Sequence, residues 1–148
     1  VVEVLGAAAA EIRPALSGLD VSLVVNPAWA AGLASSLRTG LDRALALAPD
    51  LAAVIVALAD QPGLPDGHLD QLMARHRAGG CTAVASLTDG APVPPLLFDR
   101  SWFERLRALR GDVGARALLR EHPAEIATVP LASNADLDTP EDYTRFTR

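Results

Sequence analysis

Short apolar runs alternate with longer amphipathic stretches along this chain. Val1 to Leu5 and Val21 to Val25 are rich in β-branched residues, and Leu51 to Leu58 is a continuous apolar run bounded by turn residues. Runs without polar alternation are typical of strands buried on both faces of a sheet. We therefore predict that these three segments are adjacent inner strands, with Leu51 to Leu58 the most buried of them.

Helical patterns and further strands separate these runs. The first helix is predicted within Ala7 to Leu16, where Pro14 implies that it starts near Glu11 or is bent. A second helix runs to Ala48 with Ser35 or Ser36 as its cap, and a third covers Gly67 to Arg77, capped by Asp66 and stopped by Gly79-Gly80. Further helices are predicted at Ser101 to Leu109, at Gly114 to Glu121 and after Thr139-Pro140. Further strands are predicted at Thr82 to Ser86, at Pro95 to Phe98, which its leading prolines place at an edge or end of the sheet, and at Glu125 to Val129. This alternation predicts a three-layer α/β fold with a mostly parallel sheet, in which ligands bind at the carboxyl ends of the strands.

Composition and charge narrow the class of protein. The 148 residues fit a single domain, and half of them are hydrophobic. All 13 basic residues are arginines against 18 acidic residues, and the net charge of −5 argues against a nucleic-acid-binding surface. A single cysteine excludes an internal disulfide and favours a reducing, cytoplasmic location. The longest apolar run is too short to cross a membrane.

Acidic residues follow two of the predicted strands. Asp60 comes after Leu51 to Leu58, where it could bind Mg²⁺ or cap the turn that Pro62 completes, and the residues alone favour neither interpretation. Asp136 and Asp138 precede the last helix, where they could share that metal ion or cap the helix. Two aspartates are a weak signal for a metal site without their geometry.

Small and polar residues gather where the second long helix is predicted to start. Gly32, Ser35, Ser36 and Arg38 suit a ribose or phosphate contact, although a plain capped helix is favoured on these residues alone. The glycine-rich segment Gly111 to Arg116 lacks the preceding strand of a dinucleotide-binding loop and is predicted to be a turn between helices. The other side chains with reactive or aromatic groups have structural interpretations. We predict that His68, His76 and His122 lie on the surface, that Trp102 lies in the core and that Cys81 is a small hydrophobic residue of a buried strand.

Taken in order, these clusters resemble the molybdenum-cofactor nucleotidyltransferases of the MobA/MocA-like group. The motifs that carry the resemblance are Asn26-Pro27-Ala28-Trp29 with Gly32 and Ser35-Ser36-Leu37-Arg38, Ala59-Asp60-Gln61-Pro62, Gly111-Asp112-Val113-Gly114-Ala115-Arg116, and Asp136-Leu137-Asp138-Thr139-Pro140-Glu141-Asp142. The resemblance covers essentially the whole chain. It implies a Rossmann-like nucleotidyltransferase fold and transfer of a nucleoside monophosphate from CTP or GTP to molybdopterin.

The resemblance also implies roles for individual residues. Asp60 and Asp138 would be the catalytic Mg²⁺ ligands, and the nucleotide would lie against Gly32, Ser35, Ser36, Gln61 and Pro62. The partners would be a nucleotide, a phosphorylated acceptor and a molybdoenzyme.

Two departures from the family pattern matter. The family begins with a strand and a loop of the type LAAGxGxRxGxxK, which this chain lacks, and we expect a further βα unit before Val1 in the functional protein. Pro92-Val93-Pro94-Pro95 stands where the family has Gly-His-Pro, so acceptor binding is expected to differ. Two alternative functions stay open: an NAD(P)H-dependent reductase of the nicotine-pigment type, and a non-catalytic nucleotide-binding accessory protein for molybdoenzyme maturation.

Overall fold

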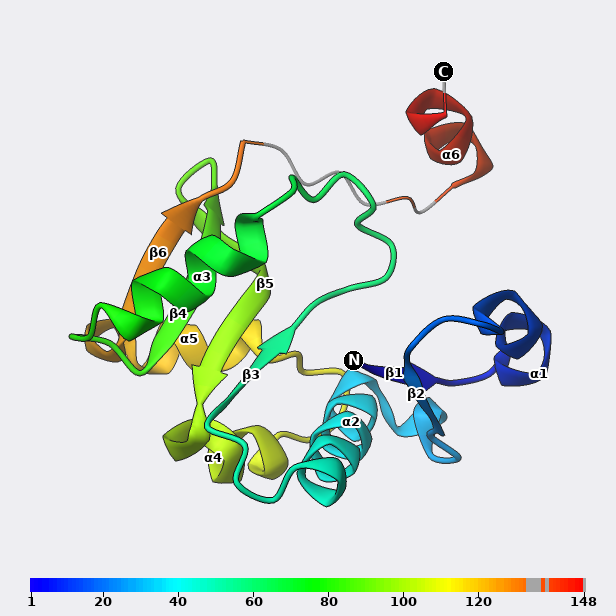
Figure 1. Ribbon diagram of the computed structural model, residues 1–148, viewed down its shortest axis with the longest axis horizontal. Coiled ribbons are helices and arrows are strands. Elements are labelled where there is room, and N and C mark those ends of the chain that lie inside the picture. The colour runs from blue at the N-terminus through cyan, green and yellow to red at the C-terminus, as the bar shows by residue number, and fades with distance from the viewer. Residues whose placement is uncertain (133–136, 138, 148) are drawn as a thin grey trace. The chain divides into compact units, whose positions relative to one another are not determined.

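The computed structural model of the chain describes residues 1–132, 137 and 139–147, and it is an α/β structure (Figure 1). Its residues form two compact units: Val1–Val54 with Asp99–Glu121, and Ile55–Phe98 with His122–Arg148. In chain order the elements are β1 (Val2–Leu5), α1 (Ala9–Ile12), η1 (Arg13–Leu16), β2 (Ser22–Val25), η2 (Trp29–Ala31), α2 (Leu33–Leu47), β3 (Ala53–Val56), α3 (His68–Arg77), β4 (Ala83–Thr88), β5 (Ala91–Asp99), η3 (Arg100–Trp102), α4 (Phe103–Ala108), α5 (Arg116–Glu121), η4 (Pro123–Glu125), β6 (Ile126–Pro130) and α6 (Pro140–Phe146), where η denotes a 3-10 helix.

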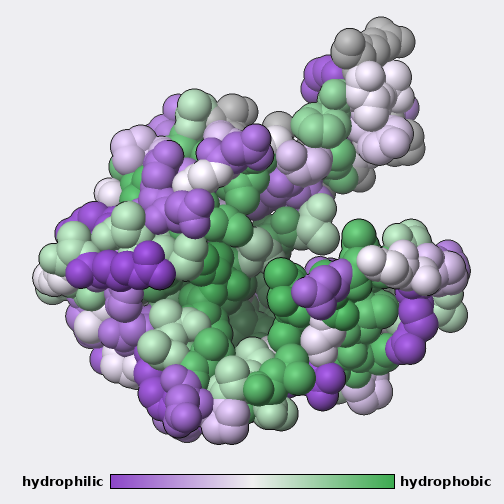
Figure 2. Space-filling view, viewed as in Figure 1, coloured by the Kyte–Doolittle hydropathy of each residue, from purple (hydrophilic) through white to green (hydrophobic). Residues whose placement is uncertain are grey.

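The first unit is built on a parallel pair of strands. β1 and β2 run side by side in a register from Val2 opposite Ser22 to Leu5 opposite Val25, which confirms that these two predicted strands are neighbours. Helix α2 packs on both strands. It approaches closely because Gly40 has no side chain: a Cβ there would lie 2.9 Å from Cγ2 of Val4. Figure 2 shows apolar surface over the part of this unit that holds the two strands.

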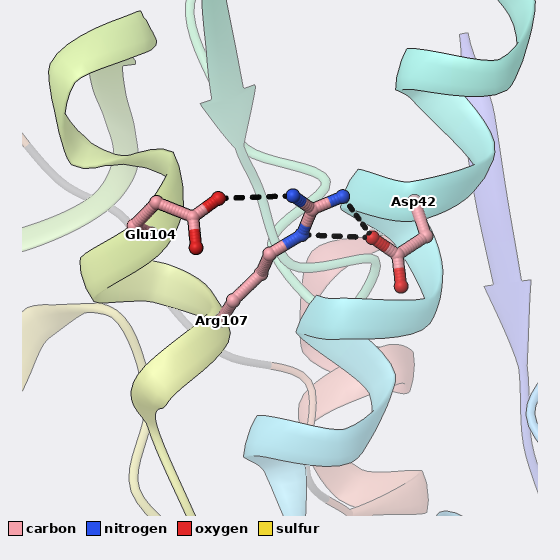
Figure 3. A network of polar contacts seen from close by, with 3 residues as sticks. All are labelled: Asp42, Glu104 and Arg107. Carbon is pink, nitrogen blue, oxygen red and sulfur yellow. Dashed lines mark hydrogen bonds and ion pairs between the residues drawn. The ribbon is translucent and has the colours of Figure 1, made fainter.

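An arginine joins the short helix α4 to the long helix α2 in the first unit. Arg107 on α4 places Nη2 2.6 Å from Oδ1 of Asp42 on α2 and Nη1 3.0 Å from Oε1 of Glu104 (Figure 3). The hydrogen bond to Asp42, followed by the one to Glu104, raises the pKa of Arg107 above its ordinary value. Because these groups face solvent, the network orients α4 on α2 more than it stabilises the fold.

The second unit is built on a mixed sheet. The order in the four-stranded sheet is β3-β5-β4-β6, with β4 parallel to β6 and antiparallel to β5. Helix α3 packs on β4 and β6. The core is densest on the two central strands, where Ala83 to Ser86 and Pro95 to Phe98 are buried. The sheet is therefore not entirely parallel, although the predicted α/β class is confirmed.

The position of Leu51 to Leu58 differs from the prediction. The strand covers only Ala53–Val56, it is half-buried throughout, and it stands at the end of the strand order beside β5 rather than beside β1 or β2. The most buried strand is β4, which has a partner on each side. A run of apolar residues indicates a strand, but the number of its neighbours decides how deeply it is buried.

The prediction of an edge position for Pro95 to Phe98 is also wrong, since β5 lies between β3 and β4. The register with β4 shifts between Ala85, which faces Leu96, and Ser86, which faces Val93. Pro94 and Pro95 fall in this irregularity, where no regular ladder hydrogen bond from their nitrogen is required. The bulge thus admits prolines into an inner strand.

The predicted helix ends agree with the structure better than the predicted order of the strands does. Thr139 caps α6 through a reciprocal capping box with Asp142, as the Thr139-Pro140 sequence predicts. Gly79 and Gly80 follow α3 with positive φ, as predicted, but its cap is Gly67 in the left-handed conformation rather than Asp66. No helix in the described ranges is long and apolar enough to span a membrane.

Candidate functional site

Asp60 lies in the loop of residues 57–67, between β3 and α3, and it is exposed. The backbone N–H of Leu137 donates a hydrogen bond of 2.8 Å to the carbonyl oxygen of Asp60. Asp138 and Asp136, the other predicted acids, lie outside the described residues. Leu137, which stands between these two acids in the sequence, is the residue of that stretch that the structure describes in contact with Asp60.

Asp60 offers one exposed carboxylate to a hard cation that keeps much of its water. Within the described ranges no group of three or more His, Cys, Asp or Glu side chains is arranged to hold a metal. Mg²⁺ does not need such a cage, because it is usually bound by one or two carboxylates, water and substrate phosphates. The exposed carboxylate of Asp60 meets that requirement. Gln61 is half-buried and Pro62 exposed beside it, so the predicted nucleotide contacts of the loop stay compatible with this placement.

A buried asparagine, which the sequence analysis included in a family motif without assigning it a role, organises the start of α2. Asn26 follows β2 and is 2% exposed. Its Nδ2 donates to Oγ of Ser35 at 2.8 Å and to Oγ of Ser36 at 3.0 Å, while its Oδ1 accepts from the N–H of Ala28 at 3.0 Å. The motif of an Asn-Pro pair at a strand end, followed by two serines at a helix start, is thus explained by hydrogen bonds within the chain.

The two serines differ in what they can offer a ligand. Ser35 is 4% exposed, and its hydroxyl lies 2.8 Å from the carbonyl of Gly32 and 2.9 Å from that of Ala28. Its hydroxyl is thus engaged inside the chain. Ser36 is half-buried and only accepts in this network, which leaves its proton for a further acceptor. Neither serine is the helix cap, because α2 is capped by Gly32 without a side-chain hydrogen bond.

The turn between α4 and α5 supplies the missing cap. Oδ1 of Asp112 accepts from the N–H of Leu33 at 3.3 Å, and the carbonyl of Gly111 accepts from the N–H of Ala34 at 3.1 Å. This confirms the inter-helix turn and shows its role in the first unit. The first amides of a helix form an anion site only when they are unoccupied, so the start of α2 is not an open phosphate cradle.

Replacing Asn26 with alanine is expected to destabilise the protein by about 2 kcal/mol, because the buried Ser35 oxygen loses its donor and the Ala28 N–H loses its acceptor. Ser36→Ala, which removes only one accepting atom of a half-buried side chain, should cost less than about 1 kcal/mol. Chemical denaturation of both variants measures the difference. Equal midpoints for the two variants would contradict a central role for Asn26.

His68 is buried, so its interpretation as a surface histidine is wrong. It is 2% exposed at the first position of α3, and its Nε2 lies 2.8 Å from Oγ of Ser86, which is 0% exposed. Ser86 Oγ in turn donates to the carbonyl of Pro95 at 2.8 Å. Of the other two histidines, both half-buried, His122 lies with Nδ1 3.3 Å from Oε1 of Glu125.

Stability is expected to fall in mild acid because of His68. Burial lowers the pKa of His68 below its ordinary value of 6.5, so the unfolded chain binds a proton more readily than the folded chain. Stability from the neutral side chain is complete above about pH 6.5 and is lost as the pH falls towards the folded-state pKa. Denaturation midpoints at about pH 7.5 and about pH 5.5 should differ less in His68→Gln than in the natural sequence. An identical difference in both proteins would contradict this origin.

The comparison with known families defines the class of protein. Residues 1–126 match the family described as MobA-like NTP transferase domain, so the chain belongs to that family. Its α/β architecture is the Rossmann-like fold of nucleotidyltransferases, as the resemblance implies.

The chain is similar to several individual proteins, of which three are described. It is 35% identical over 116 residues to the purine catabolism protein PucB of Bacillus subtilis, covering 76% of this chain and 54% of PucB, so it spans about half the length of that relative. It is 30% identical over 160 residues to nicotine blue oxidoreductase of Paenarthrobacter nicotinovorans, in an alignment that covers 99% of this chain and 74% of that protein. The structure of Rv0371c of Mycobacterium tuberculosis in complex with manganese is 27% identical in sequence and superimposes with a TM-score of 0.75. The superposition covers 97% of this chain and 75% of Rv0371c.

Proposed function

We propose that this protein is a Mg²⁺-dependent nucleotidyltransferase that moves a nucleoside monophosphate from CTP or GTP to a phosphorylated acceptor such as molybdopterin. Membership of the MobA-like NTP transferase family supports the reaction type. The observation that carries the proposal is the hydrogen bond from the Leu137 N–H to the Asp60 carbonyl, because Leu137 directly precedes Asp138 in the sequence and Asp60 and Asp138 are the two acids expected to serve one metal ion. The manganese complex of Rv0371c supports a divalent metal in this fold.

The chain's own residues would divide the work in the following way. Asp60 and Asp138 would hold the cation, which when bound neutralises charge on the α-phosphate as the acceptor attacks and pyrophosphate leaves. Ser36 would donate its free hydroxyl proton to the nucleotide. Ser35 and Gly32 would act by holding the start of α2 in place, since the Ser35 hydroxyl is engaged within the chain. Gln61 and Pro62 would border the nucleotide beside Asp60.

The triphosphate needs cationic and amide donors beyond these residues. The chain contains no lysine, and the turn at Gly111 and Asp112 occupies the first amides of α2. We therefore retain the proposal that a βα unit before Val1 supplies this grip. CTP should bind at least about tenfold more tightly to a protein that includes such a unit than to the 148 residues alone, which isothermal titration measures.

A reductase is the second candidate, because nicotine blue oxidoreductase is 30% identical in an alignment that covers 99% of this chain. A fold does not fix the chemistry, so this likeness is a specific reason to test hydride transfer from NAD(P)H. An accessory role with a molybdoenzyme partner is the third possibility, in which nucleotide would bind without turnover.

One pair of assays separates the three functions. Pyrophosphate release is measured with Mg²⁺, CTP or GTP and molybdopterin, and NADPH oxidation is measured with a nicotine-derived pigment. Pyrophosphate release that depends on both metal and acceptor is the expected result. NADPH oxidation without pyrophosphate release would overturn the proposal in favour of the reductase, and nucleotide binding without either reaction would favour the accessory role.

A further inference from the structure

The loop of residues 57–67, which carries Asp60, has no fully buried side chain. Every residue in it is exposed or half-buried. The first buried side chain after β3 is that of His68, at the start of α3. A loop without buried side chains takes its position from its ends and its hydrogen bonds. The downstream end of this loop is therefore fixed where His68 enters the core of the second unit.

The backbone turns sharply to bring His68 into that core. Gly67 adopts a left-handed conformation with φ of 77°, which glycine tolerates without strain. The N–H of His68 donates to the carbonyl of Pro65 at 3.1 Å, closing the turn. The direction in which the loop leaves α3 thus depends on how this one residue is seated.

His68 is held by a directional relay rather than by apolar contact alone. The Pro95 carbonyl can only accept, so Ser86 uses its single hydroxyl proton for the 2.8 Å bond to that oxygen. The Ser86 oxygen must then accept from Nε2–H of His68 at 2.8 Å, which assigns the proton of the neutral ring to Nε2. Ser86 lies at the register shift between β4 and β5, so the relay ends on the bulge that contains Pro95.

An apolar side chain could fill the same volume without reproducing this relay. Apolar burial is non-directional, whereas a hydrogen bond fixes the angle and distance of its donor. We propose that His68 is a positioning residue: its relay through Ser86 to the Pro95 carbonyl fixes the end of the 57–67 loop and thereby holds Asp60 in its working position. The proposal rests on the proposed function of Asp60 as a metal ligand and adds the element that sets its place.

The test compares two replacements of His68 with different hydrogen-bonding ability. His68→Gln retains an N–H donor near the position of Nε2, whereas His68→Leu fills the space without a donor. Leu72→Ala, a buried change on the same helix that leaves the relay intact, is the control for lost stability. Mn²⁺ affinity is measured by titration, and kcat and KM are measured by pyrophosphate release, all at a temperature where each variant is folded.

His68→Leu is expected to weaken Mn²⁺ binding and lower kcat by about tenfold each, the effect typical of removing a group that orients a metal ligand. His68→Gln should recover both to within about threefold, and Leu72→Ala should leave both unchanged. The proposal is overturned if His68→Leu matches Leu72→Ala, or if His68→Gln is as impaired as His68→Leu, because packing alone would then account for the residue.

Failure of the proposed function gives a different pattern. If Asp60→Asn binds Mn²⁺ as the natural sequence does, the metal role of Asp60 is wrong, and the positioning of the loop is judged by hydrogen exchange instead. Faster exchange in residues 57–67 of His68→Leu than of Leu72→Ala supports the anchoring by His68. Equal exchange in the two variants overturns it.

Discussion

Asp60→Asn is expected to abolish turnover while leaving the fold intact. The side chain is exposed in the 57–67 loop, so the substitution removes no core packing, and its backbone bond to Leu137 does not involve the carboxylate. An amide cannot balance the charge of a divalent cation as a carboxylate does. We expect a fall of at least about 100-fold in pyrophosphate release, equivalent to about 2.7 kcal/mol of transition-state stabilisation.

Asp66→Asn is the matched control for this variant, because Asp66 is an exposed aspartate in the same loop and does not cap α3. It should retain activity within about threefold and the same thermal unfolding midpoint. Equal activity of the two variants would remove Asp60 from the catalytic machinery. Loss of folding in Asp60→Asn alone would instead show that the carboxylate is structural.

Gly32→Ala is expected to produce the largest loss of stability, at least about 3 kcal/mol. Gly32 has φ of 96° and ψ of 173°, a region that residues with a side chain hardly enter. A Cβ there would also overlap the backbone of Gly111 and lie 2.6 Å from the nitrogen of Asp112. Both neighbours are main-chain atoms, so they cannot rotate away. The turn would have to leave the start of α2, and its two capping hydrogen bonds would be lost.

Gly18→Ala separates the cost of the backbone conformation from the cost of the contact with the turn. Gly18 also has positive φ, 87°, but a Cβ there would meet no heavy atom within 4 Å. It should therefore show only the conformational cost, about 1 kcal/mol. Urea denaturation of the two variants gives the comparison. Similar losses in both would mean that backbone conformation, rather than the contact with the turn, explains the requirement for glycine at position 32.

The sequence predicts this structure best where a few neighbouring residues decide the outcome. Thr139 with Pro140 and Asp142 contains the whole capping signal for α6, and Gly79-Gly80 contains the stop for α3. The parallel pairing of β1 and β2 also follows from two similar apolar runs. The family resemblance, built on several short motifs in order, is confirmed over residues 1–126.

Features that depend on residues far away in the sequence could not be predicted from it. The place of β3 in the sheet depends on β5, and β5 becomes an inner strand only because its prolines meet a shift in the register of β4. His68 on α3 can be buried because Ser86 on β4 accepts a hydrogen bond from its ring. At the start of α2, Asp112 and Gly111 replace the serine cap expected from local sequence. The metal roles of Asp60 and Asp138 stay predictions.

Because of its hydrogen bond to Asp60, the amide proton of Leu137 reports on the mobility of the 57–67 loop. This bond joins Leu137 to an exposed loop and lies outside the helices and sheets, so we expect exchange of the Leu137 proton with solvent to follow local opening rather than global unfolding. An occupant that steadies the loop at Asp60 would suppress that opening and slow the exchange. Occupancy can therefore be followed in the resting protein, without any reaction and before the acceptor is known.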